Sequence, residues 1–253
     1  MFSKVNYFRL ISGICILLFN LLTESKELDY RFQWLSFPVA NLSIEFDDHS
    51  YVNNDIRSRI ISFRLSTQGP LRLYRKYSSQ GYIKYDADMS WDYYLSGNDR
   101  GQPEEKHITY FYNMAPKIRK FIDDFGVSSI TVDPDIDKNA IDPFSVLSRT
   151  IYQLTSEQKC KSEYSVMDGK RRYRISVNLI QKNTSKINKN KSDILFHCKF
   201  TFTELKEEYK KWPFNKKDRY LDVWFSENLD YKPIRFFSKT PIGSVIGHYI
   251  VGE

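Results

Sequence analysis

The sequence contains few of the residues that usually build a metal site or activate a nucleophile. Only three cysteines and four histidines occur among its 253 residues, and none has a second cysteine or histidine at metal-ligand spacing. The glycine-rich phosphate loop, the G-x-S-x-G nucleophile turn and the H-E-x-x-H zinc pattern are absent as well. The sequence therefore predicts no metal and no cofactor, and it gives no positive evidence for an enzyme.

One acidic run is similar in spacing to the ligands of a calcium-binding loop. The segment "VDPDID", residues 132–137, places Asp133, Asp135 and Asp137 at alternate positions. It lacks the glycine and the distal glutamate of a helix–loop–helix calcium site. We interpret it as a turn that precedes a helix.

Long apolar runs are also scarce, and the only one stands near the N-terminus. Leu10 to Leu22 is apolar and follows the basic residues Lys4 and Arg9. Thirteen residues span roughly 20 Å as a helix, less than a bilayer core of roughly 30 Å. We therefore interpret residues 1–25 as a signal peptide with an uncleaved anchor as the alternative, and residues 26–253 as one exported β-rich domain in the periplasm.

Aromatic residues, by contrast, are abundant. They make up 16% of the sequence, with 18 Tyr and 18 Phe, and such residues favour strands over helices. The net charge of +7 arises from basic residues scattered among 31 acidic ones. An exported protein rarely meets nucleic acid, so this charge predicts no nucleic-acid partner. It is better suited to solubility or to peripheral contact with anionic lipid or glycan at a membrane.

Apolar and polar residues alternate over most of the mature chain, which predicts strands with one buried face. Two polar stretches, 98–106 and 181–193, are interpreted as surface loops, and the segment 69–81 suits either a strand or a short helix. One helix is predicted at "IDPFSVLSRTIYQLTS", where Asp142 caps and Pro143 suits the first turn. The predicted strands include "YRFQWLSF", "NLSIEFDD", "DIRSRIISFRLS", "GYIKYDAD", "SWDYYLSG", "HITYFYN", "SSITVDPD", "ILFHCKFTFTEL", "RYLDVWFSE", "KPIRFFSKT" and "GSVIGHYIVG".

The stretch "VMDGKRRYRISVNL" predicts a β-hairpin. Asp168-Gly169 is a strong signal for a two-residue turn, which would place Met167 opposite Lys170 and Tyr164 opposite Tyr173. The basic run would then form the solvated face of a strand, with a binding patch as the alternative. The residues expected to face water are Arg172, Arg174, Ser176 and Asn178.

The same register places Cys160 opposite Val177, on the apolar side of the hairpin. Cys198 alternates with polar residues on a later strand, so it also faces the core, while its neighbour His197 faces away and cannot pair with it as a nucleophile. In an oxidising compartment these two cysteines predict a disulfide, with two buried free thiols as the alternative. Closing a loop of about 38 residues would stabilise the fold by roughly 4 kcal/mol.

Several of these features occur together in one family. The ordered set "IDPFSVLSR", Cys160, "VMDGKRRYRISV", Cys198 and "KPIRFFSKTPIGSV" resembles an exported bacterial family known as domain of unknown function 3108, from about Tyr30 to the C-terminus. The resemblance assigns no catalytic role to the matching residues. These are Asp142, Pro143, Cys160, Asp168, Gly169, Arg171, Arg172, Tyr173 and Cys198.

The family's architecture is similar to that of periplasmic lipoprotein carriers of the LolA and LolB type. This resemblance implies a mainly β fold, namely a strongly curved antiparallel sheet or incomplete β-barrel with one or two packed helices. It also implies a non-enzymatic envelope protein that holds a lipid, an acyl chain or a lipoprotein-like ligand between sheet and helix. The candidate lining residues are Phe144, Leu147, Ile151, Tyr173, Ile175, Phe196, Phe200, Phe202, Val223 and Phe225.

Two other interpretations stay open at this point. The same aromatic residues could simply fill the core, in which case an envelope scaffold would bind protein partners through the stretches 98–106 and 181–193. A secreted hydrolase is the more remote alternative, because it would need a polar cleft with a perturbed acid or base.

Overall fold

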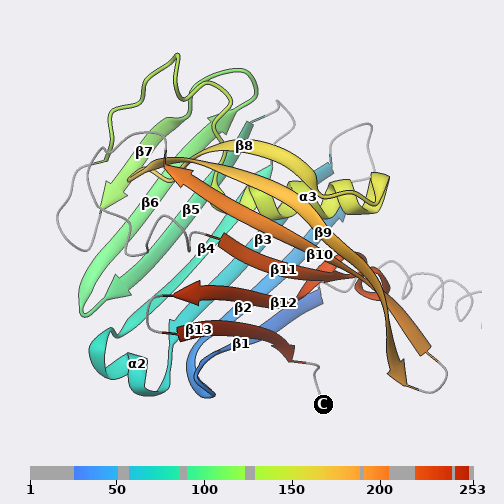
Figure 1. Cartoon of the computed structure of the whole chain (residues 1–253). Coiled ribbons are helices and arrows are strands. Elements are labelled where there is room, and N and C mark those ends of the chain that lie inside the picture. Colours follow the sequence, from blue (N-terminus) through green and yellow to red (C-terminus); the bar gives the residue numbers. More distant parts are fainter. Residues whose placement is uncertain are drawn as a thin grey trace, which may run out of the picture.

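The computed structural model describes residues 26–50, 57–85, 90–122, 129–188, 191–204, 220–240 and 243–250. The predicted signal peptide lies outside them. The described part is dominated by one antiparallel sheet of thirteen strands (Figure 1). The strands are β1 Lys26–Trp34, β2 Phe37–Ser50, β3 Arg57–Thr67, β4 Tyr77–Tyr85, β5 Ser90–Asp99, β6 Gln102–Phe111, β7 Lys117–Ile122, β8 Lys161–Met167, β9 Arg172–Asn188, β10 Lys191–Glu204, β11 Tyr220–Ser226, β12 Lys232–Thr240 and β13 Gly243–Ile250.

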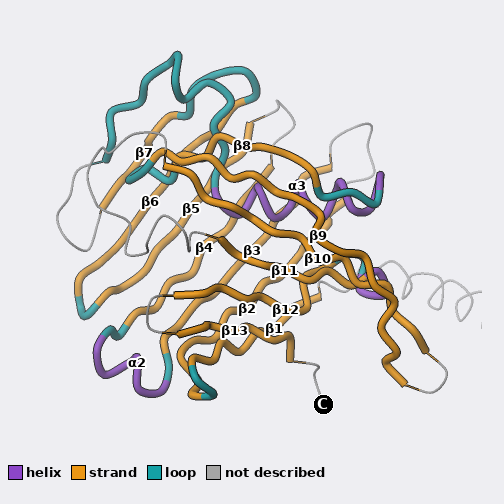
Figure 2. Tube along the Cα trace, viewed as in Figure 1, coloured by secondary structure: helices purple, strands orange, loops and turns teal. Residues whose placement is uncertain are grey.

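The first and last strands of the chain lie side by side in the middle of this sheet. β1 pairs with β13 from Asp29 opposite Ile250 to Trp34 opposite Val245. The spatial order is therefore β7-β6-β5-β4-β3-β2-β1-β13-β12-β11-β10-β9-β8, with β7 and β8 as the two edges. The sheet curls strongly but its ladder does not close (Figure 2). This confirms the predicted mainly β fold with a curved, incompletely closed sheet.

The inner face of the sheet carries the apolar residues of the alternating pattern. On this face, aromatic rings pack directly against the backbone of glycines, which lets the sheet curve tightly. An aromatic ring lies over the backbone at two glycines, where no Cβ would fit. A Cβ at Gly81 would lie 2.5 Å from the ring of Phe63, and one at Gly247 would lie 2.6 Å from the ring of Phe32. Glycine at these two positions thus lets large rings lie flat against neighbouring strands, as expected where a sheet bends sharply.

In the described part of the chain, two α-helices accompany the sheet. The predicted helix is present as α3 Pro143–Glu157, which packs on the concave side. The ambiguous segment 69–81 contains both alternatives: a short helix, α2 Gly69–Tyr74, beside β2, and then the start of β4 at Tyr77. Among the described residues, no helix is long and apolar enough to cross a membrane.

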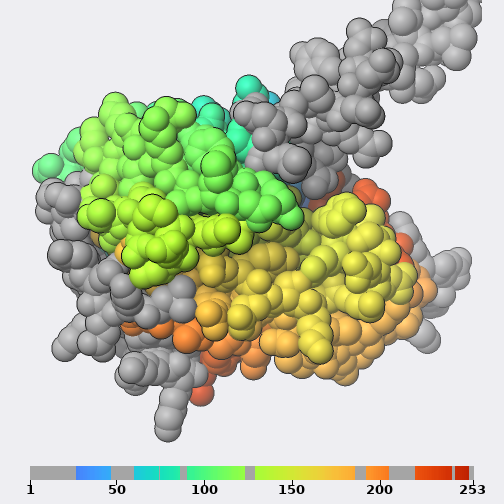
Figure 3. Space-filling model, turned by 90° about the horizontal axis from the view of Figure 1, so that it is seen from above, coloured from blue at the N-terminus to red at the C-terminus, as the bar shows by residue number. Residues whose placement is uncertain are grey.

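The gap between the edge strands is bridged by residues 129–142, which we call the strap. The amide of Ile130 donates to the carbonyl of Gly169 (3.0 Å), and Ile141 forms a parallel bridge with Val166 beside β8. The strap contains residues 129–135 of the predicted strand "SSITVDPD", whose first residue lies outside the described ones. The prediction of a strand there is wrong, because the apolar residues Ile130 and Ile141 are buried in a connection rather than in a ladder. From above, the yellow-green and yellow surface, which includes the strap, α3 and β8, lies between green and orange surface (Figure 3).

The β8–β9 hairpin is present, but its turn is longer than predicted. Met167 faces Arg172, so the turn comprises four residues, 168–171. The carboxylate of Asp168 accepts hydrogen bonds from the amides of Lys170 (2.9 Å) and Arg171 (2.8 Å), and this side-chain turn replaces the two-residue turn. Only Gly169 has a positive φ, 82°.

The longer turn shifts the predicted pairing by two residues, so Tyr164 faces Ile175 instead of Tyr173. A shift of two keeps every side chain on its predicted side, because side chains alternate with a period of two. Tyr173, Ile175 and Val177 accordingly remain buried, and Arg174 remains exposed.

Arg172 is the exception, and its predicted exposure to water is wrong. The strap covers it, and its side chain is only 5% exposed. Its Nε lies 2.6 Å from Oδ1 of Asp137 and its Nη2 lies 2.8 Å from Oδ2, while Nη2 also bonds the carbonyl of Thr131. Arg172, part of the basic run, thus binds the strap from a buried position and does not belong to a solvated face.

Both stretches predicted to be loops are mainly strand. At 98–106 the loop is reduced to Arg100-Gly101, with φ of 54° and 91°, and Asp99 pairs with Gln102. This is the type of two-residue turn that was expected at Asp168-Gly169. In the other stretch, β9 and β10 pair as far as Asn188 and Lys191, forming a long two-stranded arm.

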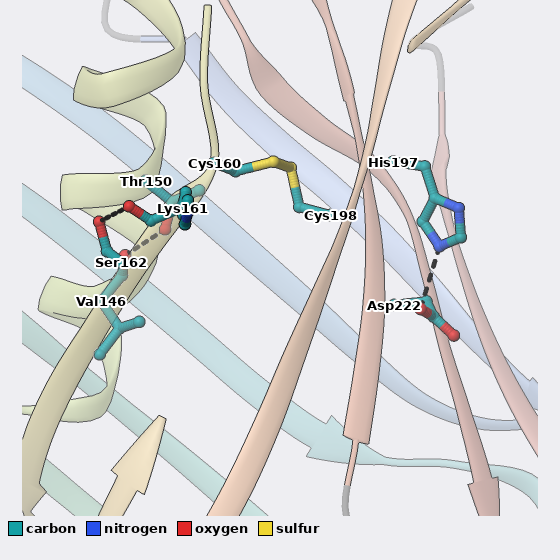
Figure 4. The surroundings of a disulfide bond; sticks show 8 residues. All are labelled: Val146, Thr150, Cys160, Lys161, Ser162, His197, Cys198 and Asp222. Atoms are coloured by element: carbon teal, nitrogen blue, oxygen red, sulfur yellow. Dashed lines mark hydrogen bonds and ion pairs between the residues drawn. A yellow bond between two sulfur atoms is a disulfide. The ribbon is translucent and has the colours of Figure 1, made fainter. Parts of the chain in front are cut away.

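The predicted disulfide between Cys160 and Cys198 is present (Figure 4), with both residues fully buried. It ties the segment between α3 and β8 to β10. His197 lies on the opposite side of the β10 ribbon, as alternation requires. Its Nε2 lies 3.0 Å from the Asp222 carboxylate, and its ring stacks on Trp224 at 4.2 Å between centroids.

Candidate functional site

The candidate site is the space between α3 and the concave face, and the start of α3 determines its shape. Oδ1 of Asp142 accepts a hydrogen bond from the amide of Ser145 (2.8 Å), and Pro143 occupies the first turn. The helix ends where Gln158 adopts a left-handed conformation and its amide donates to Leu154. The predicted cap at Asp142 thus fixes the start of the helix, and Gln158, which was not predicted, caps its end.

A buried polar cluster anchors the first turn of α3 to the sheet. Asp142 is fully buried, and burial raises its pKa. Its carboxylate accepts from the indole Nε1 of Trp91 (2.8 Å) and from the Ser145 hydroxyl, and these donors partly offset the effect of burial on the pKa. The hydroxyl of Tyr85 completes the cluster, 2.9 Å from Ser145 Oγ. The Trp91 indole and the amide and hydroxyl of Ser145 all donate to the carboxylate of Asp142, the residue that caps α3. The cluster therefore holds the start of the helix in place.

Phe144 also attaches the helix to the sheet. Its ring stacks on Phe63 with a centroid distance of 4.0 Å and an interplanar angle of 12°. Arg149, one turn further on, lies 5.4 Å from the ring of Trp91. These contacts tie the N-terminal half of α3 to β3 and β5, on one side of the concavity.

An apolar cavity of about 270 Å³ remains on the other side. It lies between the first half of α3 and strands β1, β2, β9, β10, β11 and β12. Every lining residue is apolar: Phe32, Leu42, Ile44, Pro143, Phe144, Val146, Leu147, Ile175, Phe200, Phe202, Leu221, Val223 and Phe236. A space of this kind suits a hydrocarbon group, and its volume is near the lower end of the range for ligand pockets, about 300–1,000 Å³.

The cavity opens toward one end of the strands. Phe32, Leu42, Phe202 and Leu221 are partly exposed, whereas Val223 and Ile175 are buried. Phe32 lies two residues before the end of β1, and Leu221 is the second residue of β11. The mouth therefore lies at the end of the sheet that carries the β1–β2 turn.

Six of the ten predicted lining residues border this cavity: Phe144, Leu147, Ile175, Phe200, Phe202 and Val223. The other four lie in the packed core: Ile151, Tyr173, Phe196 and Phe225. Seven lining residues were not predicted. Pro143 and Val146 lie on α3, and Leu221 lies on β11. The other four, Phe32, Leu42, Ile44 and Phe236, lie on β1, β2 and β12 and alternate inward like the predicted ones. Their membership depends on the pairing of β1 with β13, which no local pattern reveals.

Two larger hollows lie on the outer face of β1–β5, with volumes of about 400 and 520 Å³. Both include Ser43, Arg64 and Gln80; long charged and aromatic side chains line most of the smaller hollow, and short polar side chains line most of the larger one. They are open depressions in a solvated face. The apolar cavity is the better candidate because its walls come from both the helix and the sheet and are apolar.

The acidic run of the strap is occupied by internal bonds. Oδ1 of Asp133 accepts from the amides of Asp135 (3.0 Å) and Ile136 (3.2 Å), and Asp137 holds Arg172. Within the described part of the chain, no group of three or more His, Cys, Asp or Glu side chains could hold a metal ion.

The comparisons with known proteins agree with this architecture. Residues 29–249 match the profile of the family described as "Protein of unknown function (DUF3108)". The chain belongs to this family. A crystal structure of a β-barrel-like protein of domain of unknown function DUF1849 from Brucella abortus is similar, with a TM-score of 0.58 and 11% identity over 88% of this chain and 94% of that one. This likeness concerns the fold alone. No curated protein matches the chain.

Proposed function

We propose that this member of the DUF3108 family is a non-enzymatic protein of the bacterial envelope that holds an acyl chain in the cavity between α3 and the sheet. The observation that supports it most directly is the cavity itself, whose lining is entirely apolar. An unfilled apolar space costs stability, because its walls lose the contacts that packing would give. An acyl chain would restore those contacts.

The proposed location is the periplasm. The Cys160–Cys198 bond supports a compartment without strong reductant, since such bonds rarely persist in the cytosol. The bond also joins the connection behind α3 to β10, which carries the lining residues Phe200 and Phe202. It would thus help to hold the two walls of the cavity at a constant spacing.

Two experiments test the proposal. The first identifies any ligand that the purified protein carries, and the second fills the cavity with a larger side chain and measures ligand binding. Native mass spectrometry of protein purified from its own host should show an added lipid or fatty-acid mass. Leu147→Trp places a larger side chain in the cavity and should displace most of a fluorescent fatty acid. Tyr152→Trp is the matched control, because Tyr152 lies on the same helix but is 68% exposed and should bind the probe normally.

Bare protein from the host, together with equal probe binding by both tryptophan variants, would reject the proposal. It would then favour a scaffold acting through its surface, for which the arm of β9 and β10 offers the exposed side chains of Leu179 and Ile180.

A further inference from the structure

The end of the sheet next to the cavity mouth exposes an unusual group of apolar side chains. Leu73 is 88% exposed, Leu35 62%, Phe37 57% and Leu71 37%. Leu71 and Leu73 belong to α2, while Leu35 and Phe37 belong to the β1–β2 turn and the start of β2. These four side chains are called here the docking edge. Exposed apolar groups gathered at one place mark an interaction surface.

The two parts of the docking edge are held against each other. The amide of Gln68 donates to the carbonyl of Val39 (2.7 Å), and a Cβ at Gly69 would lie 2.3 Å from the carbonyl of Pro38. Figure 1 places α2 beside the β1–β2 turn at the lower end of the sheet. The residues of the docking edge therefore lie at the same end of the sheet.

The β1–β2 turn breaks a local rule to present its leucine. Leu35 and Ser36 both have positive φ, 47° and 70°, in a two-residue turn that normally takes Asn and Gly. A leucine in this left-handed conformation is strained and, here, mostly exposed. Departures from local preference of this kind occur where a side chain is needed for function.

Basic residues lie within and just after α2, next to the docking edge in the chain. Arg72 lies between the two exposed leucines of α2, and Arg75 and Lys76 follow the helix. Arg100 joins them, because its amide donates to the carbonyl of Lys76 (2.8 Å). Arg75 and Arg100 both contact the carboxylate of Asp99.

We propose that the docking edge inserts into the surface of an anionic phospholipid membrane. Apolar side chains next to Arg and Lys are the combination that binds the headgroup region, where the leucines reach the acyl boundary and the cations meet phosphate. This binding does not depend on what the cavity holds. The Leu147→Trp variant should bind vesicles as the wild type does, so the two proposals can fail separately.

The first test is vesicle flotation of the exported protein, with phosphatidylcholine vesicles containing about one third phosphatidylglycerol. Leu35→Asn suits the turn better than leucine does, and Leu73 is almost fully exposed, so the combined Leu35→Asn and Leu73→Glu variant should stay folded. Its affinity should fall by about tenfold for each leucine removed. Tyr152→Ser, an exposed apolar residue elsewhere, should leave affinity unchanged.

The second test reports the contact at a single position, so that an attached N-terminal segment cannot produce the signal. A polarity-sensitive dye is placed at Leu73→Cys or at Tyr152→Cys, each in a Cys15→Ser background. Anionic vesicles should shift the emission to the blue at position 73 only, and the shift should weaken with added salt.

Several outcomes would overturn the proposal. They are equal shifts at both positions, no shift at either, or unchanged flotation of the Leu35→Asn and Leu73→Glu variant. A dimer that forms without vesicles and is lost in the same variant would assign the surface to a second copy of the chain instead.

Discussion

The Arg172–Asp137 pair offers a strong test of how the open seam of the sheet is fastened. Both side chains are buried, with 5% and 2% exposed, and the guanidinium contacts both carboxylate oxygens. Removing one partner leaves the other charge buried without its counter-ion, which costs about 3–5 kcal/mol. We therefore expect Arg172→Met to lower the free energy of unfolding by about that amount.

The pair's own contribution comes from a double-mutant cycle of Arg172→Met and Asp137→Leu. The double variant should lose much less than the sum of the single variants, with a coupling energy of about 2–3 kcal/mol, since neither charge is then left alone. Asp137 also accepts the amide of Asp133 (2.7 Å), so its single variant should be the more costly one. Urea unfolding followed by tryptophan fluorescence measures all four proteins.

The same β9 strand supplies the control. Arg174 and Glu163 form an ion pair 3.3 Å apart, but their side chains are 45% and 57% exposed. Solvent screening limits such a pair to about 0–1 kcal/mol. A coupling energy for Arg172–Asp137 no larger than that for Arg174–Glu163, or one that falls equally in 1 M salt, would refute the view that the strap buries a charge pair.

Three further predictions concern single features of the fold. Replacing Cys160 and Cys198 by serine should lower the free energy of unfolding by roughly 4 kcal/mol in chemical denaturation, because a closed loop of 38 residues is released; an unchanged denaturation midpoint would contradict this. Gly169→Ala should cost about 1–3 kcal/mol, since φ is 82° and the new Cβ would lie 2.9 Å from the ring of Phe121, and thermal unfolding measures it. Because burial raises the pKa of Asp142 in the folded state, the wild type should gain stability relative to Asp142→Asn as pH falls through that raised pKa; a gain as pH rises would show the opposite sign.

Local patterns were sufficient for the elements that depend on neighbouring residues. Asp142 and Pro143 locate the start of α3, and alternation places Cys160 and Cys198 on the side where they meet. The two-residue error in the β8–β9 register does not change the predicted side of the sheet for either cysteine, because side chains alternate with a period of two. The predicted sides survive a register error when, as here, the shift is an even number of residues.

Local patterns did not predict the features that depend on contacts with segments distant in the sequence. Ile130 and Val132 alternate like strand residues, yet they belong to the strap, whose backbone bonds go to Gly169 and β8. Arg172 has the pattern of a solvated residue, and only the strap's return over β9 buries it. The cavity is the extreme case: Phe196 and Phe200 have the same pattern, but one fills the core and the other borders the empty space.

The positions of the cavity mouth and the docking edge relate the two proposals to each other. Phe32 lies near the end of β1, and the turn beyond that end carries Leu35 at its tip. A membrane bound by Leu35 and Leu73 would therefore face the same end of the sheet as the partly exposed lining residues. An acyl chain entering there would pass from the bilayer into the cavity with little exposure of its methylene groups to water, at about 0.8 kcal/mol for each group kept dry. A cavity mouth at the opposite end would have required the chain to cross solvent, so the shared end is the arrangement that both proposals need.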